Sequence, residues 1–400
     1  MFNYKKSILL SSLIVFINYA YAQDSLPPKL NMDALYNRPF LTIKKVPIAI
    51  GGYIEANTQY DNIDGVASGW GFQMRRMTLF FSSTVAKKIR FLSEIEFENG
   101  TQEINIETAV ADIEFHPLLV LRTGILLNPI GAFNQNHDGP RWDFVDRPLV
   151  STEIVPSTLS NVGMGLYGKY YKKNWILGYE AYLTNGFDDN LIENDMGRTS
   201  FHAAKSNPNK FESSYSGSPL FSTKVAVRNR KYGELGLSYL TGIYNQWLVE
   251  GTQVDDKRRA VMMALDFTTS VFKNSIAITG EIVKARIALP TNYIQTYGTR
   301  QLGGYCDVTF TALQKSVLGW ANARVLLGVR LEYVDYNQDK FRITHAKIFD
   351  EVYAITPTIS FRPTGSAVLR LNYQHRHTVD LLGNPPSVQR SIQVGLSTYF

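Results

Sequence analysis

The sequence predicts an all-β protein: a transmembrane antiparallel β-barrel of about sixteen strands with an inward-folded third loop. Three observations support this fold class. Apolar and polar residues alternate with a period of two along most of the chain, no long amphipathic helical pattern is present, and short and long connections between the expected strands alternate. Alternation lowers the average hydropathy, so such a barrel resembles a soluble protein in composition.

The composition excludes several other classes. Hydrophobic residues make up 44%, aromatic residues 12% and charged residues 19% of the 400 residues, whereas a disordered chain is poor in aromatics and rich in charge. After residue 22 no uncharged apolar run approaches the ~18 residues that a spanning helix needs. Cys306 is the only cysteine, so no internal disulfide is possible.

The N-terminus predicts export. Residues 1–22 carry Lys5 and Lys6, then an apolar stretch, then Ala20-Tyr21-Ala22, which is the pattern of a cleavable signal peptide. Its removal lowers the net charge from +6 to +4, too small a bias to indicate a nucleic-acid partner. We expect residues 23–47 to form a short periplasmic segment, too small for a plug, and residues 48–400 to form the barrel.

The strands follow from the alternation, for example Val261, Met263 and Leu265 against Met262 and Ala264. We expect strands at 48–60, 71–85, 89–98, 104–115, 119–127, 162–171, 174–185, 220–229, 232–244, 260–272, 274–288, 300–314, 321–335, 351–362, 366–377 and 388–400.

Seven connections are then short and eight are mostly long, the first long one being 61–70. Short turns on one rim and long loops on the other are typical of a barrel in the outer membrane of a Gram-negative bacterium, with both termini in the periplasm. The final strand ends on Phe400, which resembles the C-terminal signature of such proteins and implies recognition by the barrel-assembly machinery.

The connection 128–161 is the third long loop, and sixteen strands enclose a lumen wide enough to be aqueous. The loop combines charged residues with apolar anchors such as Trp142, Phe144 and Leu149, which favours folding against another surface. We expect this surface to be the lumen wall, where the loop charges would narrow the pore. The alternative is a packed extracellular cap.

The candidate pore-constriction residues belong to this loop and to the strands around it: Arg75, Arg76, Glu94, Glu96, Arg122, Arg141, Asp143, Asp146 and Arg147. Arg75 and Arg76 are adjacent, so one of them should face the lumen. Across all the strands, seven cations and seven anions occupy positions of the inward phase, which predicts a lumen of mixed charge. They are Arg122, Lys224, Arg228, Arg324, Arg330, Arg370 and Arg376 against Glu94, Glu96, Glu98, Glu180, Asp266, Glu281 and Glu332. For any one of them, wall solvation and internal ion pairing are the plainer role.

Several segments resemble the phosphate-selective porin O/P family: 71–81 (GFQMRRMTLFF), 91–97 (FLSEIEF), 121–129 (LRTGILLNP), 144–150 (FVDRPLV), 161–168 (NVGMGLYG) and 183–186 (LTNG). The similarity is close over about residues 70–186. It implies a sixteen-stranded porin, a homotrimer, and conduction of small anions along a ladder of arginines and a lysine cluster. The third loop contains no lysine and is mixed in sign, so we expect weak selectivity.

Neither an enzyme nor a metal site is predicted. None of the six histidines stands in a signature of nucleophilic catalysis, and no Gly-x-Ser-x-Gly elbow is present. His375 and His377 lie on one face of a strand, but the sequence offers no evident third metal ligand. We expect no cofactor.

The predicted function is passive diffusion of ions, with phosphate or other small anions as candidates, and of small polar solutes. The partners are then membrane lipids and the solutes themselves. The alternative is a non-conducting barrel that serves as a docking platform through the loops 186–219 and 336–350.

Overall fold

The computed structural model describes residues 30–42, 48–100, 102–205, 210–272, 274–290, 293, 297–341 and 343–400. The predicted signal peptide lies outside the described residues, as do residues 23–29 and 43–47 of the following segment, so these boundaries stay predictions. No helix within the described ranges is long and apolar enough to cross a membrane.

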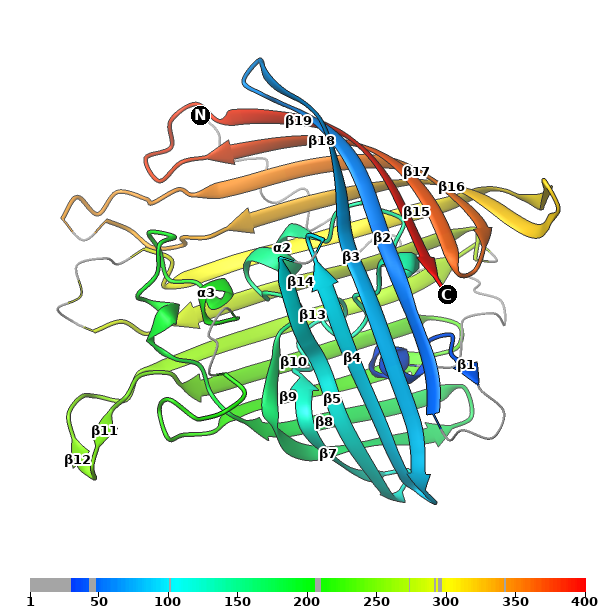
Figure 1. Ribbon diagram of the computed structural model, residues 1–400. Coiled ribbons are helices and arrows are strands. Elements are labelled where there is room, and N and C mark those ends of the chain that lie inside the picture. Colours follow the sequence, from blue (N-terminus) through cyan, green and yellow to red (C-terminus); the bar gives the residue numbers. More distant parts are fainter. Residues whose placement is uncertain are drawn as a thin grey trace.

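Sixteen strands form one closed antiparallel barrel (Figure 1). They are β2 (Ile48–Ile63), β3 (Val66–Ala86), β4 (Ile89–Glu98), β5 (Glu103–His116), β6 (Leu119–Leu127), β7 (Ser160–Lys172), β8 (Trp175–Thr184), β9 (Leu220–Asn229), β10 (Gly233–Ile243), β13 (Arg259–Val271), β14 (Ile276–Ile287), β15 (Arg300–Val317), β16 (Trp320–Asp335), β17 (Glu351–Thr364), β18 (Ala367–Val379) and β19 (Ser387–Tyr399). Each strand pairs with the next, and β19 pairs with β2 to close the barrel. The predicted fold class and all sixteen strands are confirmed.

The remaining elements are short and lie in the connections or before β2. They are η2 (Asn31–Tyr36), β1 (Leu41–Thr42), η3 (Gly139–Arg141), α2 (Leu149–Glu153), η4 (Asp189–Leu191), α3 (Phe201–Lys205), β11 (Leu248–Val249) and β12 (Thr252–Gln253).

The outward faces of the strands carry the apolar phase that the sequence predicted for lipid contact. Met263 and Leu265 on β13 are 51% and 42% exposed, whereas Met262 and Ala264 between them are buried on the inner side. Leu369 and Leu371 repeat this pattern on β18. Such an exterior suits the acyl chains of a bilayer.

The predicted long loop 61–70 is wrong. Strands β2 and β3 continue through it to a two-residue turn, where Asp64 and Gly65 both have positive φ, of 51° and 92°. Asp-Gly is a preferred pair for such hairpins. The period-two signal fades here because both faces of β3 are exposed from Val66 to Met74, so no apolar phase is required.

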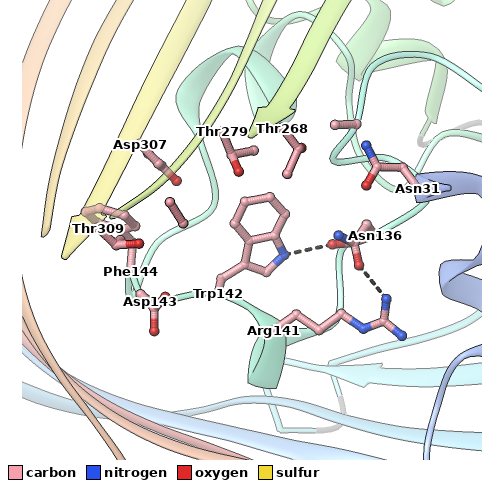
Figure 2. Close-up of a pocket in the computed structure, with 12 residues that line it drawn as sticks. Asn31, Asn136, Arg141, Trp142, Asp143, Phe144, Thr268, Thr279, Asp307 and Thr309 are labelled. Atoms are coloured by element: carbon pink, nitrogen blue, oxygen red, sulfur yellow. Dashed lines mark hydrogen bonds between the residues drawn. The ribbon is translucent and has the colours of Figure 1, made fainter. Parts of the chain in front are cut away.

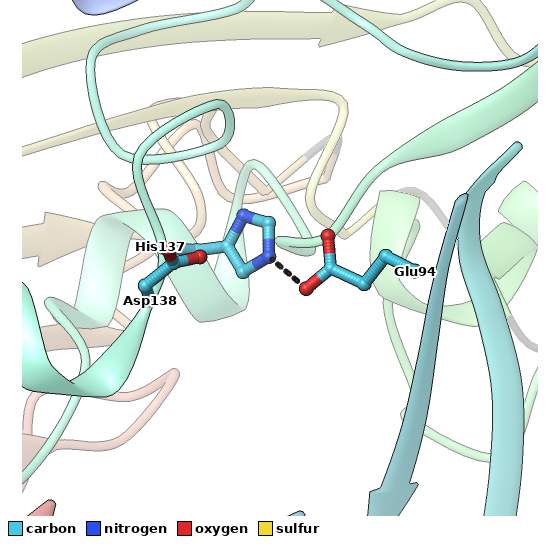
Figure 3. A group of neighbouring side chains, drawn as sticks. All are labelled: Glu94, His137 and Asp138. Carbon is cyan, nitrogen blue, oxygen red and sulfur yellow. Dashed lines mark hydrogen bonds and ion pairs between the residues drawn. The ribbon is translucent and has the colours of Figure 1, made fainter. Parts of the chain in front are cut away.

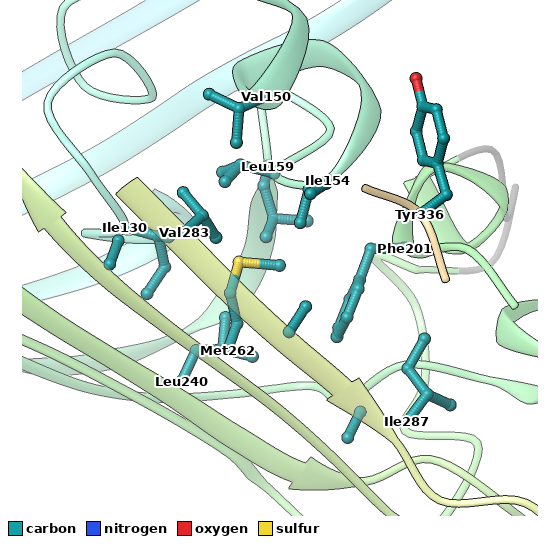
Figure 4. Packing of buried hydrophobic residues seen from close by; sticks show 14 of the residues in the cluster. Ile130, Val150, Ile154, Leu159, Phe201, Leu240, Met262, Val283, Ile287 and Tyr336 are labelled. Atoms are coloured by element: carbon teal, nitrogen blue, oxygen red, sulfur yellow. The ribbon is translucent and has the colours of Figure 1, made fainter. Parts of the chain in front are cut away.

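The third loop folds into the lumen, as predicted. Its apolar residues Ile130, Val150, Ile154 and Leu159 join one buried cluster with inward side chains of the wall, among them Leu240 and Met262 (Figure 4). Val283 and Ile287 of β14 lie on the wall side of the same cluster. We call this cluster the apolar sector; the expectation of a polar lumen face is wrong there, because loop side chains replace water against the wall.

The segment before β2, expected to be periplasmic and too small for a plug, packs in its described part against inward side chains of the wall. Leu30 and Met32 share a buried cluster with inward residues of β6, β7, β8 and β9. The backbone N–H of Asn31 donates to Glu234 of β10, and the Tyr36 hydroxyl donates to Asp112 of β5 at 2.8 Å. Leu30 and the short helix η2 thus contact six strands, β5 to β10, from inside the lumen.

Candidate functional site

The candidate site is the lumen around the third loop, which the wall holds by its cations. Side-chain N–H groups of Lys224, Arg362, Arg370 and Arg330 donate to the loop carbonyls of Gly131, Pro140, Phe144 and Asp146 at 2.6, 2.7, 2.8 and 2.7 Å respectively. Three of the seven cations predicted to face inward, together with Arg362, therefore position the backbone of the loop. A charge-assisted bond to a carbonyl also satisfies a polar group that would otherwise be buried unpaired.

Arg75 and Arg76 both point into the lumen, so the expectation that only one of them would do so is wrong. The register between β2 and β3 shifts at this point, with Glu55 opposite Arg76 and Ala56 opposite Met74. Arg75 is the extra residue of this β-bulge. A bulge breaks the strict alternation of the strand and lets adjacent side chains share one face.

Arg75 meets the loop at Asp146. Its guanidinium lies 2.7 Å from the Asp146 carboxylate and 3.0 Å from the carbonyl oxygen of Val145. Gln393 of β19 donates to the second carboxylate oxygen at 2.5 Å. Burial raises the pKa of Asp146, but Arg75 and these hydrogen bonds outweigh it and lower the pKa. This pair is a charged contact between loop and wall that still touches solvent, since Asp146 is 33% exposed.

Arg76 sits among carboxylates. It lies 2.7 Å from Glu98, 3.0 Å from Glu55 and 3.4 Å from Glu96. Arg147 of the loop approaches Glu96 at 3.9 Å and donates to the carbonyl of Ser157 at 3.2 Å. The predicted residues Arg76, Glu96 and Arg147 are thus brought together. We call this group, with Arg75 and Asp146, the charged sector.

Glu94 belongs to a separate buried network with His137 and Asp138 of the loop (Figure 3). One ligand atom from each lies within 4.8 Å of the others, which is metal-like spacing. Arg38 of the N-terminal segment, however, lies 2.9 Å from Glu94 and 2.7 Å from Asp138. A guanidinium therefore already supplies the positive charge, and the group serves as an ion-pair clasp between segment, loop and wall.

Arg122 lies apart from the other predicted residues. It forms a bidentate pair with Asp112, both bonds being 2.8 Å, and its guanidinium stacks over Tyr167 at 4.5 Å. The N-terminal Tyr36 shares Asp112 with it. Arg122 thus anchors the segment before β2 and does not face the loop charges.

Arg141 and Asp143 line two adjoining cavities, of about 200 and 320 Å³, between the loop and the wall (Figure 2). Arg141 is fixed by Asn136 at 2.5 Å and by the Tyr399 hydroxyl at 2.9 Å. Asp143 pairs with Arg362 at 2.7 Å. The cavity of about 320 Å³ reaches the short-turn rim, because its lining includes the turn residues Asn274 and Gly365.

One cavity-lining charge is free. Among the described residues Arg324 makes neither an ion pair nor a hydrogen bond, whereas Asp307 is neutralised by Arg330 at 2.7 Å. The phase of β16 already pointed Arg324 inward, but nothing in the sequence distinguishes a free cation from a paired one. Arg38 and Arg362 are absent from the predicted site. Arg362 follows the inward phase of its strand, while Arg38 precedes every strand and has no sequence signal.

His375 and His377 face outward at the long-loop end of β18, with their Nε2 atoms 2.8 Å apart. The neighbouring residue on β19 is Arg390, which opposes His375 in register. Within the described ranges the only group of three or more spatially clustered metal-type ligands is Glu94, His137 and Asp138. The histidine pair therefore has no third ligand there.

By sequence, the chain is similar to a known protein over about a third of its length. No family model matches the chain. A stretch of 149 residues is 34% identical to an uncharacterized protein of Aquifex aeolicus (strain VF5), covering 36% of this chain and 33% of that protein. The match therefore spans about a third of the relative's length.

Solved structures share the fold. The outer membrane channel DcaP of Acinetobacter baumannii is similar with a TM-score of 0.55 and 12% identity, over 88% of this chain and 97% of that one. An anion-selective porin from Comamonas acidovorans gives 0.54 and 11%, over 88% and 99%. OprB of Pseudomonas putida gives 0.54 and 10%, over 88% and 94%. The closed barrel with its apolar exterior places this chain in the outer membrane of a Gram-negative bacterium.

Proposed function

We propose that the protein is a porin that lets ions and small polar solutes diffuse passively through its lumen. The observation that carries the proposal is the third loop, which lies in the lumen and places charged side chains beside cavities of about 200 and 320 Å³. Folded-in charges that narrow an aqueous passage are the usual means by which a pore selects by size and sign. The likeness to porin barrels supports the architecture.

The selectivity follows from which charges remain free. Arg75, Arg76 and Arg362 are each paired with a carboxylate, so their fields are largely cancelled. Arg324 is the unpaired cation of the cavity wall among the described residues. We therefore expect a weak preference for small anions, phosphate included, and not the tight phosphate site that a ladder of free arginines would provide.

A second candidate deserves a test because the lumen is well filled. Leu30, Met32 and the third loop all pack against inward side chains of the wall, which narrows the passage and favours a small conductance or none. A non-conducting barrel would then act through its exposed loops as a docking platform.

Purified protein in a planar lipid bilayer separates the two candidates. A porin gives discrete, ohmic conductance steps, and a potassium chloride gradient then gives a reversal potential on the anion side. Arg324→Gln should move that potential toward zero, while Lys173→Gln in an exposed turn should leave it unchanged. A barrel that inserts but never conducts would contradict the porin function.

We also propose two kinds of partner for this porin. The resemblance implies a homotrimer, and the C-terminal Phe400 implies insertion by the barrel-assembly machinery. Cross-linking in native membranes and a Phe400 deletion test these two points.

A further inference from the structure

The barrel exterior carries a row of basic side chains where lipid-facing residues are expected. On β14 the outward side chains are apolar up to Ile282 and become Lys284 and Arg286 toward the long-loop rim, and both are exposed. Arg259 on β13 and Arg300 on β15 face outward beside them and are exposed as well. We call these four residues the basic row.

The basic row does not serve the lumen. The residues between its members on β14, Val283, Ala285 and Ile287, point inward and belong to the apolar sector. The usual pattern of this barrel, apolar outside and polar inside, is therefore inverted on this half of the strand. Neither the pore nor the packing of the core has a use for these cations.

The row is also poor in compensating charge. Arg286 lies directly opposite Arg300 in the register of β14 and β15, a like-charged cross-strand pair that destabilises a sheet. Among the described residues, Lys284 and Arg286 have no ion pair or hydrogen bond. Arg300 alone of the four has an ion pair in the described part of the chain, with Asp339 at 3.5 Å, and its side chain is still 55% exposed. Arg259, Lys284 and Arg286 therefore have no carboxylate partner among the described residues, and neighbouring cations of this kind form a site for an external anion.

We propose that the basic row binds the phosphate groups of an anionic lipid headgroup in the leaflet at the long-loop rim. Its place beside the apolar band sets the acyl chains of such a lipid against Ile282 and Met263 while the phosphates meet Lys284, Arg286 and Arg300. Arginine pairs phosphate oxygens in a bidentate manner, and basic side chains near an anionic surface each strengthen lipid binding. The site is independent of whether the lumen conducts.

The test compares lipid binding by the full-length detergent-solubilised barrel and its Lys284→Gln/Arg286→Gln variant. The probes are lipopolysaccharide in mixed micelles, the same lipid after removal of its phosphates, and inorganic phosphate, with retained lipid counted by native mass spectrometry. Lys172→Gln/Lys173→Gln at the opposite rim is the control with an equal loss of charge. The single variant Arg300→Gln keeps the test available if the double variant does not fold.

We expect the double variant to bind the phosphorylated lipid roughly thirtyfold more weakly, about fivefold for each cation, with the control unchanged. Inorganic phosphate should compete only at concentrations far above those of the lipid. Equal binding of the dephosphorylated lipid, an equal loss in the control, unchanged affinity in the double variant, or inorganic phosphate binding as tightly as the lipid would each overturn the proposal.

Discussion

The third loop meets the wall in two ways, and the two sectors differ in what they contribute. In the apolar sector Ile154 and Val150 pack on the wall with less than 1% exposure, away from solvent. In the charged sector Arg75 and Asp146 hold the same loop through an ion pair that remains partly in water. Apolar burial stabilises without regard to solutes, whereas wetted charges also act on passing ions. The apolar sector therefore only fixes the loop, whereas the charged sector also places a balanced pair of charges beside passing ions.

The largest effect is expected from a charge placed in the apolar sector. Ile154→Asp buries an unpaired carboxylate against Gly303 and Met262, which costs several kcal/mol unless the loop leaves the wall. We expect the single-channel conductance to rise severalfold and the urea midpoint of unfolding to fall. Thr152→Asp, on the short helix α2 that ends just before Ile154 and partly exposed, adds the same charge and should change neither quantity much. Unchanged conductance in Ile154→Asp would mean that this sector does not hold the loop.

In the charged sector we expect a smaller effect, a shift of the reversal potential whose direction depends on which charge is removed. Arg75→Gln removes a lumenal cation and should shift the reversal potential toward cation preference, whereas Asp146→Asn should shift it the other way. The double variant should return near the wild type, with a coupling energy of about 1–2 kcal/mol between the two sites in urea unfolding. Additive shifts without coupling would contradict the 2.7 Å pair.

The smallest effect is expected in the pH dependence of the free energy of unfolding. Burial raises the pKa of Asp138, but Arg38 beside it outweighs burial and lowers that pKa below its ordinary value near 4. A carboxylate with a lowered folded pKa contributes stability that is full above pH 4 and is lost as the pH falls further. We expect the stability gap between the wild type and Asp138→Asn, measured by urea unfolding, to be constant from pH 7 to 5 and to shrink below about 4. A gap that widens in acid would contradict the clasp.

Much of the barrel is predictable because lipid imposes one rule on every strand. Strand phase placed the inward side chains of Glu94, Glu96 and Arg122 correctly, since each lies on a regular two-sided strand. Strand phase gives no information where no face of the strand has to be apolar. The β2–β3 hairpin has both faces exposed, so its continuation to Asp64 left no apolar phase to read.

The site is less predictable because it depends on contacts between distant segments. The bulge at Arg75 depends on a local register shift, and the clasp of Arg38 joins residues 100 positions apart along the chain. The apolar inner face of β14 looked like part of a wet lumen until the loop that covers it was in place. Sequence periodicity reports which face a side chain occupies, but it does not report what lies against that face.

The first and last strands of the barrel, β2 and β19, pair at a seam. Side chains in the lumen contact both of these strands. Glu55 of β2 pairs with Arg370 at 3.0 Å, Tyr399 of β19 accepts from Arg141 of the loop, and Arg38 joins the same loop through Asp138. The strands at this seam are the most distant in sequence, so their meeting carries the largest loss of chain entropy. Filling of the lumen and closure of the seam therefore stabilise each other, and the barrel is expected to complete its assembly around its contents in one cooperative step.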